Sequence, residues 1–339
     1  GYAVAGAAPG QSFTVTGEAL AGRGFTGSVG QGQAVRIFTG APVPDGAARV
    51  VIQEDVVRTG DRITLREGLD AGLHIRPRGQ DFRAGDTLAP RRLRPADLAV
   101  LAAMNLPVVA VARRPEVAII PTGDELVQPG EAPRDDQIVA STGVALKAMA
   151  EEAGAVVRLL PIARDSAASL RAVLDLAAGA DLVVTIGGAS VGDHDLVARV
   201  AGEAGFAPAF HKIAMRPGKP LMAGRFGDGV LMGLPGNPVS SVACAILFML
   251  PLIRAMQGDP SPLPRPLRAV LACDTGPAGP RAHYMRARLD VGEGLPRITP
   301  FDRQDSALLS VLAAADALLI RPQGDGARKA GETVDFLPL

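Results

Sequence analysis

The sequence has little of what several protein classes require. Its 339 residues include two cysteines, Cys244 and Cys273, too few for a disulfide framework or a four-cysteine zinc site. The four histidines do not show the HExxH spacing of metalloproteases. The longest apolar run, 239–253, is shorter than the roughly 20 residues of a membrane span and contains Pro251. We therefore expect no membrane insertion, and the pattern does not indicate zinc.

The chain also has no net charge and few aromatic side chains. Basic and acidic residues are equal at 35 each, there is no tryptophan, and aromatics make up 4% of the chain. A balanced charge and few stacking platforms argue against nucleic-acid binding. Neither a Walker A sequence nor a GxGxxG fingerprint in the first strand-to-helix turn is present, which disfavours P-loop and NAD chemistry. No secretory signal is visible, so the cytoplasm is the expected compartment.

What the chain does have is 40 glycines and 28 prolines, which predict many turns. Short alternating runs such as 12–16, 33–38 and 49–52 indicate a β-rich domain of hairpins over residues 1–90. Residues 91–114 form a connector with a helix near 97–104, after Pro95. A proline-rich linker at 260–266 precedes a C-terminal β domain at 267–339.

Between these β regions, residues 115–259 alternate strand and helix. The predicted strands cover 117–120, 156–162, 182–186 and 229–232, and the predicted helices cover 141–153, 167–178, 196–203 and 239–257. Such alternation predicts a doubly wound α/β domain with a parallel sheet. The fold class is therefore α/β plus β, with a central α/β domain and a β domain on each side.

Ligands of open parallel sheets bind beyond the carboxyl ends of the strands. This rule places four stretches on one rim, namely 122–125, 164–165, 187–195 and 233–238. The glycine-rich turn Gly187–Gly192 lies at the centre of the set and lets an anion approach the backbone. Ser190 has no histidine–carboxylate partner at a recognisable spacing, so its hydroxyl is interpreted as a binding group.

The rim also carries both signs of charge. Its acids are Asp124, Glu125, Asp165, Asp193 and Asp195, and its bases are Lys212, Arg216 and Lys219. Carboxylates suit Mg²⁺, and the cations suit a phosphate or another oxyanion. The alternative is that these are solvated loop charges.

Short motifs then occur in a specific order. They are Thr-Gly-Ala-Pro-Val-Pro at 39–44, Arg-Gly-Gln-Asp at 78–81, Pro-Thr-Gly-Asp-Glu-Leu at 121–126, Gly-Gly-Ala-Ser-Val-Gly at 187–192, Arg-Pro-Gly-Lys-Pro at 216–220 and Gly-Leu-Pro-Gly-Asn-Pro at 233–238. Together they resemble the molybdopterin molybdenumtransferases, the MoeA family that includes the E domain of gephyrin. The resemblance extends over essentially the whole chain.

The resemblance implies a reaction in which adenylylated molybdopterin and molybdate give the molybdenum cofactor and AMP, with Mg²⁺ or a similar divalent ion. It implies a homodimer of chains that each have a β-rich domain, a molybdopterin-binding (MogA-like) α/β domain and a C-terminal β-barrel-like domain. It also implies small-molecule substrates and other molybdenum cofactor biosynthesis proteins as partners, with no nucleic acid and no membrane.

The resemblance also implies site residues. The catalytic set is Thr39, Asp81, Glu125, Asp165, Asp195, Lys212 and Arg216. The substrate-binding set is Gly187, Gly188, Ser190, Gly192, Lys219, Pro235, Gly236, Pro238 and Ser306. From the acids of the rim, the predicted metal ligands are Asp124, Glu125, Asp193 and Asp195. Thr39 and Asp81, from the β-rich domain, are expected to close the site across the dimer.

The chain departs from the family pattern at several positions. Arg216 stands where the family often has lysine, and Asp305 and Ala307 stand where glycine and histidine are usual. Family members also carry an aspartate and a helical segment before the Gly-Tyr-Ala-Val that here starts at Gly1. We therefore expect this chain to lack that acid and part of the dimer-forming region. Two alternatives stay open, a molybdopterin adenylyltransferase and a non-catalytic molybdopterin-binding scaffold.

Overall fold

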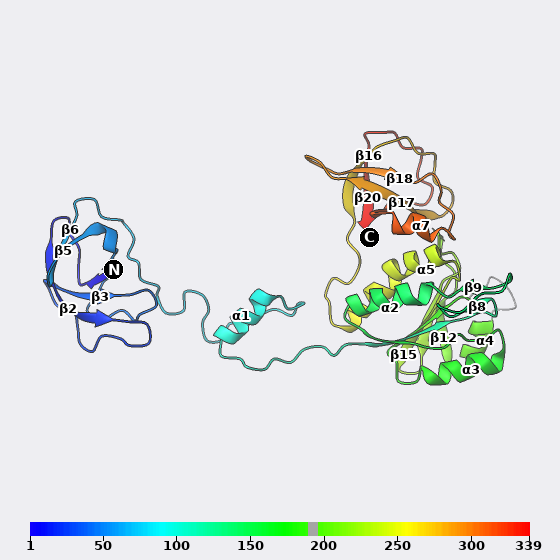
Figure 1. The fold of residues 1–339 in the computed structure, drawn as a ribbon, viewed down its shortest axis with the longest axis horizontal. Coiled ribbons are helices and arrows are strands. Elements are labelled where there is room, and N and C mark those ends of the chain that lie inside the picture. The colour runs from blue at the N-terminus through cyan, green and yellow to red at the C-terminus, as the bar shows by residue number, and fades with distance from the viewer. Residues whose placement is uncertain (189–195) are drawn as a thin grey trace. The chain divides into compact units, whose positions relative to one another are not determined.

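The computed structural model describes residues 1–188 and 196–339. The chain divides into two compact units, Gly1–Ala89 and Pro90–Leu339, each described here by itself (Figure 1).

The first unit is a six-stranded sheet in the order β4-β1-β3-β2-β6-β5. Its elements are β1 (Tyr2–Val4), β2 (Ser12–Ala19), β3 (Gln33–Ile37), β4 (Arg49–Val51), the short 3₁₀ helix η1 (Gln53–Asp55), β5 (Val56–Thr59) and β6 (Arg62–Leu65). Ile63 and Leu65 of β6 are buried while Arg62 and Thr64 are exposed, as a half-buried strand requires. The prediction of hairpins is right for β5 and β6, which pair antiparallel. It is wrong for β2 and β3, which pair in parallel.

The second unit starts with the helix α1 (Pro95–Ala103). Pro95 occupies its first turn, where a missing N–H costs nothing. The carboxylate of Asp97 accepts the backbone N–H of Arg94 at 2.9 Å and a guanidinium N–H of Arg91 at 2.5 Å. These bonds, the Arg94 side chain first among them, lower the pKa of Asp97 to about 2. The acid therefore fixes the start of this helix.

The central sheet has the order β10-β7-β11-β15-β14-β12. Its strands are β7 (Glu116–Pro121), β10 (Val156–Leu159), β11 (Leu182–Ile186), β12 (Phe206–Phe210), β14 (Met222–Phe226) and β15 (Gly229–Leu234). The strands from β10 to β15 are parallel, as predicted. β14 pairs antiparallel with both β15 and β12, so the sheet is mixed, and neither β14 nor β12 is among the predicted strands. A smaller parallel pair joins β8 (Leu126–Val127) to β9 (Ile138–Val139).

Helices cover both faces of this sheet, as Figure 1 shows. They are α2 (Thr142–Glu152), α3 (Ala167–Leu176), α4 (Leu196–Glu203), α5 (Pro238–Cys244) and α6 (Leu250–Met256). Alternate residues of β7 point to opposite faces. Val117 and Ile119 pack in one hydrophobic cluster, and Ala118 and Ile120 in the other. The strand is therefore apolar and buried from Val117 to Pro121, which is typical of a sheet buried on both sides.

The segment Pro238–Met256 forms one 19-residue helix, long and apolar enough by composition to cross a membrane. In this fold, 56% of its apolar window is buried, with Met249 and Ile253 in the core of the α/β domain. A π-helical turn, η2 (Ala245–Met249), lies between α5 and α6. The N–H of Leu250 donates to Ala245 O within this turn, immediately before Pro251, which has no N–H to give. The helix is thus a core element of the second unit.

The C-terminal part is a small barrel. Its elements are β16 (Leu267–Leu271), β17 (Ala282–Asp290), β18 (Arg297–Pro300), α7 (Leu309–Ala313), β19 (Ala317–Arg321) and β20 (Thr333–Pro338). The order β17-β18-β16-β20-β19 closes because β19 also pairs with β17. One further strand, β13 (Met215–Arg216), comes from the α/β domain and pairs with β17. The predicted β-barrel-like domain is therefore confirmed, and it is joined to the α/β domain by a shared strand.

Candidate functional site

Tight turns meet at the carboxyl ends of the parallel strands. The N–H of Gly187, after β11, donates to Leu234 O at 3.0 Å, and Gly187 has a φ of 89°. A side-chain carbon at Gly187 would lie 2.9 Å from Thr122 O and 3.8 Å from the Cα of Gly236. Only glycine fits there, because the conformation is left-handed and a backbone oxygen is too close. The turns after β7, β11 and β15 are therefore in mutual contact.

The second glycine of this turn is equally confined. Gly188 has a φ of 68°, and a side-chain carbon there would lie 2.3 Å from the Cγ2 of Val197. The turn after β11 therefore packs directly against Val197 in the first turn of α4. The remaining predicted members of this stretch, Ser190, Gly192, Asp193 and Asp195, lie outside the described residues.

The turn after β15 is held by its own helix. The hydroxyl of Ser241, in α5, donates to Pro235 O and lies 3.3 Å from Asn237 O. Pro235 is buried, whereas Gly236 and Asn237 are exposed. The turn therefore presents polar backbone and the Asn237 side chain outward from a fixed base.

The acidic turn after β7 is fixed by a neighbouring arginine. One terminal nitrogen of Arg164 donates to Gly123 O at 3.3 Å, Asp124 O at 3.2 Å and Leu126 O at 2.9 Å. The N–H of Asp165 donates to the Oδ1 of Asp124 at 3.1 Å. The residues Asp124 and Asp165 are exposed, as is Glu125. Their carboxylates therefore lie on two linked turns and are open to solvent.

This arrangement fits a magnesium ion better than a zinc ion. Within the described ranges, no cluster of three or more acidic, histidine or cysteine side chains gathers as a metal site. Mg²⁺ is usually held by one or two carboxylates, with waters and substrate phosphates completing its shell. Asp124 and Glu125 can supply such oxygens, although one oxygen of Asp124 already accepts a hydrogen bond. The donor chemistry of these described residues is thus compatible with Mg²⁺.

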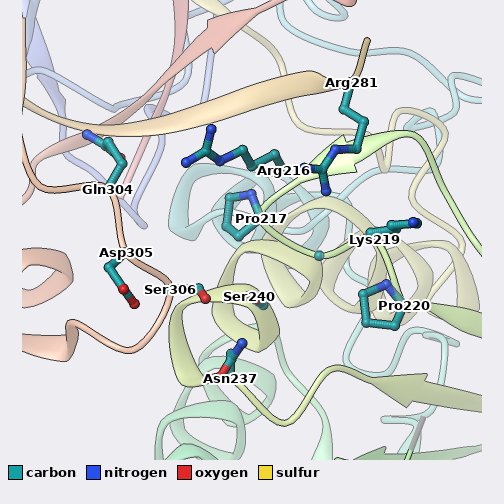
Figure 2. Close-up of a pocket in the computed structure, with 11 residues that line it drawn as sticks. Arg216, Pro217, Lys219, Pro220, Asn237, Ser240, Arg281, Gln304, Asp305 and Ser306 are labelled. Atoms are coloured by element: carbon teal, nitrogen blue, oxygen red, sulfur yellow. The ribbon is translucent and has the colours of Figure 1, made fainter. Parts of the chain in front are cut away.

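Next to the turn after β15 lies a pocket of about 330 Å³. Figure 2 shows the segment 304–306 on one side and the loop 216–220 on the other. The lining residues are Arg216, Pro217, Gly218, Lys219, Pro220, Asn237, Ser240, Arg281, Gln304, Asp305 and Ser306. The pocket therefore lies between the α/β domain and the barrel, within one compact unit.

Main-chain pairing builds this pocket. In the β13–β17 pair, Arg216 is opposite His283, and Ala282 N donates to Ala214 O at 2.9 Å. This pairing brings Arg216 close to Arg281, which immediately precedes β17. On the opposite side, the N–H of Val239 donates to Ser306 O at 3.1 Å, so the barrel segment contacts the start of α5.

The pocket is lined by three cations and one acid. Among the described residues, Arg216, Lys219 and Arg281 form no ion pair with a carboxylate. The carboxylate of Asp305 is the acid in the lining, and its Oδ1 accepts the N–H of Ala307 at 2.8 Å. An anion with more than one negative charge would complete this balance.

His283 is affected by the same positive charge. Burial, first, and then the nearby cations Arg216, Arg286, Arg321 and Arg281 together lower its pKa to about 4. The imidazole is therefore neutral at pH 7 and adds no charge of its own.

The structure brings together some predicted site residues and leaves others apart. Arg216, Lys219 and Ser306 line the pocket, and Pro238 follows its lining residue Asn237. Lys212 is exposed and outside the lining, although the next residue, Ile213, donates its N–H to Lys219 O at 3.2 Å. Thr39 and Asp81 belong to the first unit and are exposed there.

Sequence reasoning missed several lining residues, namely Ser240, Arg281, Gln304 and the acid Asp305 as a binding-site member. Asn237 lies inside the predicted motif 233–238 and could have been chosen from it. Arg281 has no local signal, because only the pairing of β17 with β13 places it beside Arg216.

The α/β domain carries glycine-rich turns and acids at its strand ends, and a basic pocket lies between it and the barrel. This arrangement is typical of a protein that binds an anionic small molecule. Comparisons with known proteins specify the family. Models for the MoeA N-terminal region (domain I and II), a probable molybdopterin binding domain and the MoeA C-terminal region (domain IV) match residues 1–105, 118–255 and 268–339.

Similar proteins agree with these matches. A molybdopterin molybdenumtransferase of Staphylococcus aureus is 32% identical over 91% of this chain and 74% of its own length. The molybdopterin molybdenumtransferase 2 of Mycobacterium tuberculosis is 37% identical over 85% of this chain and 73% of its own. A crystal structure of the molybdopterin biosynthesis MoeA protein of Pyrococcus horikosii covers 100% of this chain and 85% of its own, with 30% identity and a TM-score of 0.81.

The chain belongs to the MoeA family of molybdopterin molybdenumtransferases, which act in molybdenum cofactor biosynthesis. The predicted family, fold class and enzyme class are confirmed.

Proposed function

We propose that this enzyme inserts molybdate into adenylylated molybdopterin and releases AMP and the molybdenum cofactor. The observation that carries this proposal is the basic pocket, whose Arg216, Lys219 and Arg281 form no ion pair with a described carboxylate. Molybdate is a compact dianion, and guanidinium groups bind tetrahedral oxyanions through paired N–H donors. The pocket lies directly beside the turns of the molybdopterin-binding domain, so both substrates can meet there.

In this proposal the pocket binds molybdate. Arg216 and Arg281 provide the charge, Lys219 adds a third cation, and the side chains of Ser240 and Ser306 offer neutral donors. Lys212 lies on the same loop outside the lining and would increase the local concentration of anions.

The pterin and its diphosphate would lie along the strand ends. The backbone of Gly187 and Gly188 and the turn containing Pro235, Gly236 and Pro238 give close approach without side-chain obstruction. Ser190 and Gly192 belong to the same predicted binding turn. An oxygen of water or molybdate would attack a phosphorus of the diphosphate, so that one P–O bond forms as the other breaks, and nearby cations would stabilise the negative charge on the departing phosphate.

A magnesium ion would be held by Asp124 and Glu125, with Asp193 and Asp195 as the other predicted ligands. When bound, it would neutralise phosphate charge at the bond that breaks. Asp165, whose N–H holds the Asp124 carboxylate, would keep this ligand oriented and can accept a pterin N–H itself. Thr39 and Asp81 of the first unit would complete the site in a homodimer, and other molybdenum cofactor biosynthesis proteins would deliver and collect the pterin.

We further infer a cytoplasmic location, which suits two cysteines that are both free thiols.

The test is AMP release from adenylylated molybdopterin by the purified chain, measured with and without molybdate and with Mg²⁺ varied. We expect AMP release only when molybdate is present. AMP transfer from ATP would instead indicate the adenylyltransferase, and tight pterin binding without turnover would indicate a scaffold. A Glu125→Ala variant with the wild-type rate and the wild-type Mg²⁺ dependence would contradict the metal assignment.

A further inference from the structure

We propose that the buried Arg286, acting through Gln304, is a positioning residue that fixes the barrel side of the molybdate pocket. The proposal rests on the proposed function of that pocket. Arg286 lies in β17 and is 2% exposed, so it is outside the lining and cannot itself contact the anion.

Arg286 and Gln304 are joined by reciprocal hydrogen bonds. The Oε1 of Gln304 accepts the backbone N–H of Arg286 at 3.1 Å and its side-chain N–H groups, Nε at 3.2 Å and Nη2 at 3.1 Å. In return, the Nε2 of Gln304 donates to Arg286 O at 3.0 Å and to Phe301 O at 2.7 Å. The amide of Gln304 is thus held on both sides.

The guanidinium reaches two more residues of the same segment. Its Nη1 donates to Asp305 O at 2.6 Å, and its Nη2 lies 3.4 Å from Arg303 O. Residues 303–305 therefore wrap around one buried side chain. The next residue, Ser306, accepts the N–H of Val239 through its carbonyl at 3.1 Å. The segment that forms one side of the pocket is fixed at both ends, by Arg286 in the barrel and by α5 in the α/β domain.

Arg286 also brings a positive charge that has no ion-pair partner among the described residues. All its acceptors are amide or carbonyl oxygens, and no described carboxylate forms an ion pair with it. Burial lowers its pKa, the Asp305 charge opposes this shift and the Arg216 charge adds to it, and an arginine keeps its proton. The residue therefore adds positive potential to the pocket while it holds the 303–305 segment.

Lysine cannot perform both tasks. An ammonium group has the charge but lacks the planar fork that serves Gln304 and Asp305 together. Arg286→Lys thus separates positioning from charge, and Arg286→Met removes both. Gln304→Ala leaves the arginine in place and removes its main partner. Arg321→Met is the matched control, because Arg321 is also a 2% exposed arginine of the barrel, but its hydrogen bonds go to Asp325, Thr275 and Gly326 and not to the 303–305 segment.

The experiment compares these full-chain variants by the KM for molybdate, the KM for adenylylated molybdopterin, the Kd of molybdate alone by calorimetry, and the melting temperature. We expect Arg286→Lys and Gln304→Ala to raise the molybdate KM and Kd about tenfold, as loss of one charged hydrogen bond does. Arg286→Met should raise both further. The KM for the pterin should change less than about twofold, since the strand-end turns are untouched. Arg321→Met should lower only the melting temperature.

The outcomes separate the two proposals. If wild-type AMP release does not depend on molybdate, the proposed function fails. If release depends on molybdate, but the Arg286 and Gln304 variants lose only thermal stability, as Arg321→Met does, the positioning role is overturned. If Arg286→Met does not fold, Arg286→Lys and Gln304→Ala decide by the same criterion.

Discussion

The barrel contains two groups of arginines that differ in what neutralises them. In the first, the Nε of Arg321 is 2.6 Å from Asp325, and Arg328 is 2.7 Å from the other oxygen of the same carboxylate. Arg328 also pairs with Glu332 at 3.1 Å. Hydrogen bonds from Arg328 and then Arg321 lower the pKa of Asp325. In the second, Arg281 and Arg286 lie with Arg216 and have no described carboxylate as an ion-pair partner.

The difference separates a structural role from a binding role. A buried arginine with a carboxylate and carbonyl partners is satisfied within the protein, and its removal leaves a charge without a partner. Cations left without protein partners at a pocket keep their attraction for an outside anion. The first group should therefore control stability, and the second should control the use of molybdate.

The largest effect is expected from the paired group. Arg321→Met leaves Asp325 without its buried partner and removes donors to Thr275 and Gly326. Breaking a buried ion pair on one side costs about 3–5 kcal/mol of unfolding free energy. Urea unfolding of wild type and variant measures this loss. A fall in the apparent molybdate affinity of the folded variant would contradict the assignment of a purely structural role to the paired arginines.

The next effect is expected at the pocket. Arg281→Ala removes a lining cation that has no ion-pair partner among the described residues, so the melting temperature should stay close to wild type. Loss of one anion-stabilising donor typically lowers the rate about 100-fold. We expect a loss of this size in the kcat/KM for molybdate, measured in the AMP-release assay. Arg328→Ala is the control, because that arginine is paired outside the pocket and its loss should leave kcat/KM unchanged. Equal activity losses in both variants would contradict the assignment.

The smallest effect is a pH dependence at His283, which lies near members of both groups. Its folded pKa is about 4, below the unfolded value of about 6.5. Between these values the unfolded chain binds a proton that the folded chain does not, so stability falls as pH drops from 6.5 towards 4. The unfolding free energy of the wild type should therefore fall relative to that of His283→Gln as the pH is lowered from 6.5 to 4. Molybdate should raise the His283 pKa in an NMR titration, and no change would argue against a nearby dianion.

Much of the α/β domain follows from the sequence. β11 and α4 have the predicted bounds, 182–186 and 196–203, because a continuous apolar run and an apolar stripe are local signals. β12 was missed because Pro208 lies within it, and proline argues against a strand. β14 was missed although Gly227 and Asp228 form the turn to β15, a hairpin signal that reasoning from strand–helix alternation ignored.

The pocket shows where such reasoning stops. Arg216 and Lys219 lie in a motif that is recognisable by itself, and the structure places both in the lining. Arg281 and Gln304 reach the same pocket only because the barrel pairs with β13 and its 303–306 segment contacts α5. These contacts join segments far apart in the chain, and no local sequence pattern at Arg281 or Gln304 predicts them. In the sequence, Arg286 is one residue of the β17 strand, and nothing nearby predicts its contacts with residues 303–305.

The two-residue strand β13 limits how this protein can be recombined with its relatives. In sequence it belongs to the α/β domain, and in hydrogen bonding it belongs to the barrel. A chimera cut in the linker at 260–266 would place a foreign β17 beside the native Arg216 and a foreign 303–306 segment beside the native α5. Exchange of whole domains at that linker would mix two halves of one binding pocket. A functional swap must therefore carry residues 212–220 together with the barrel.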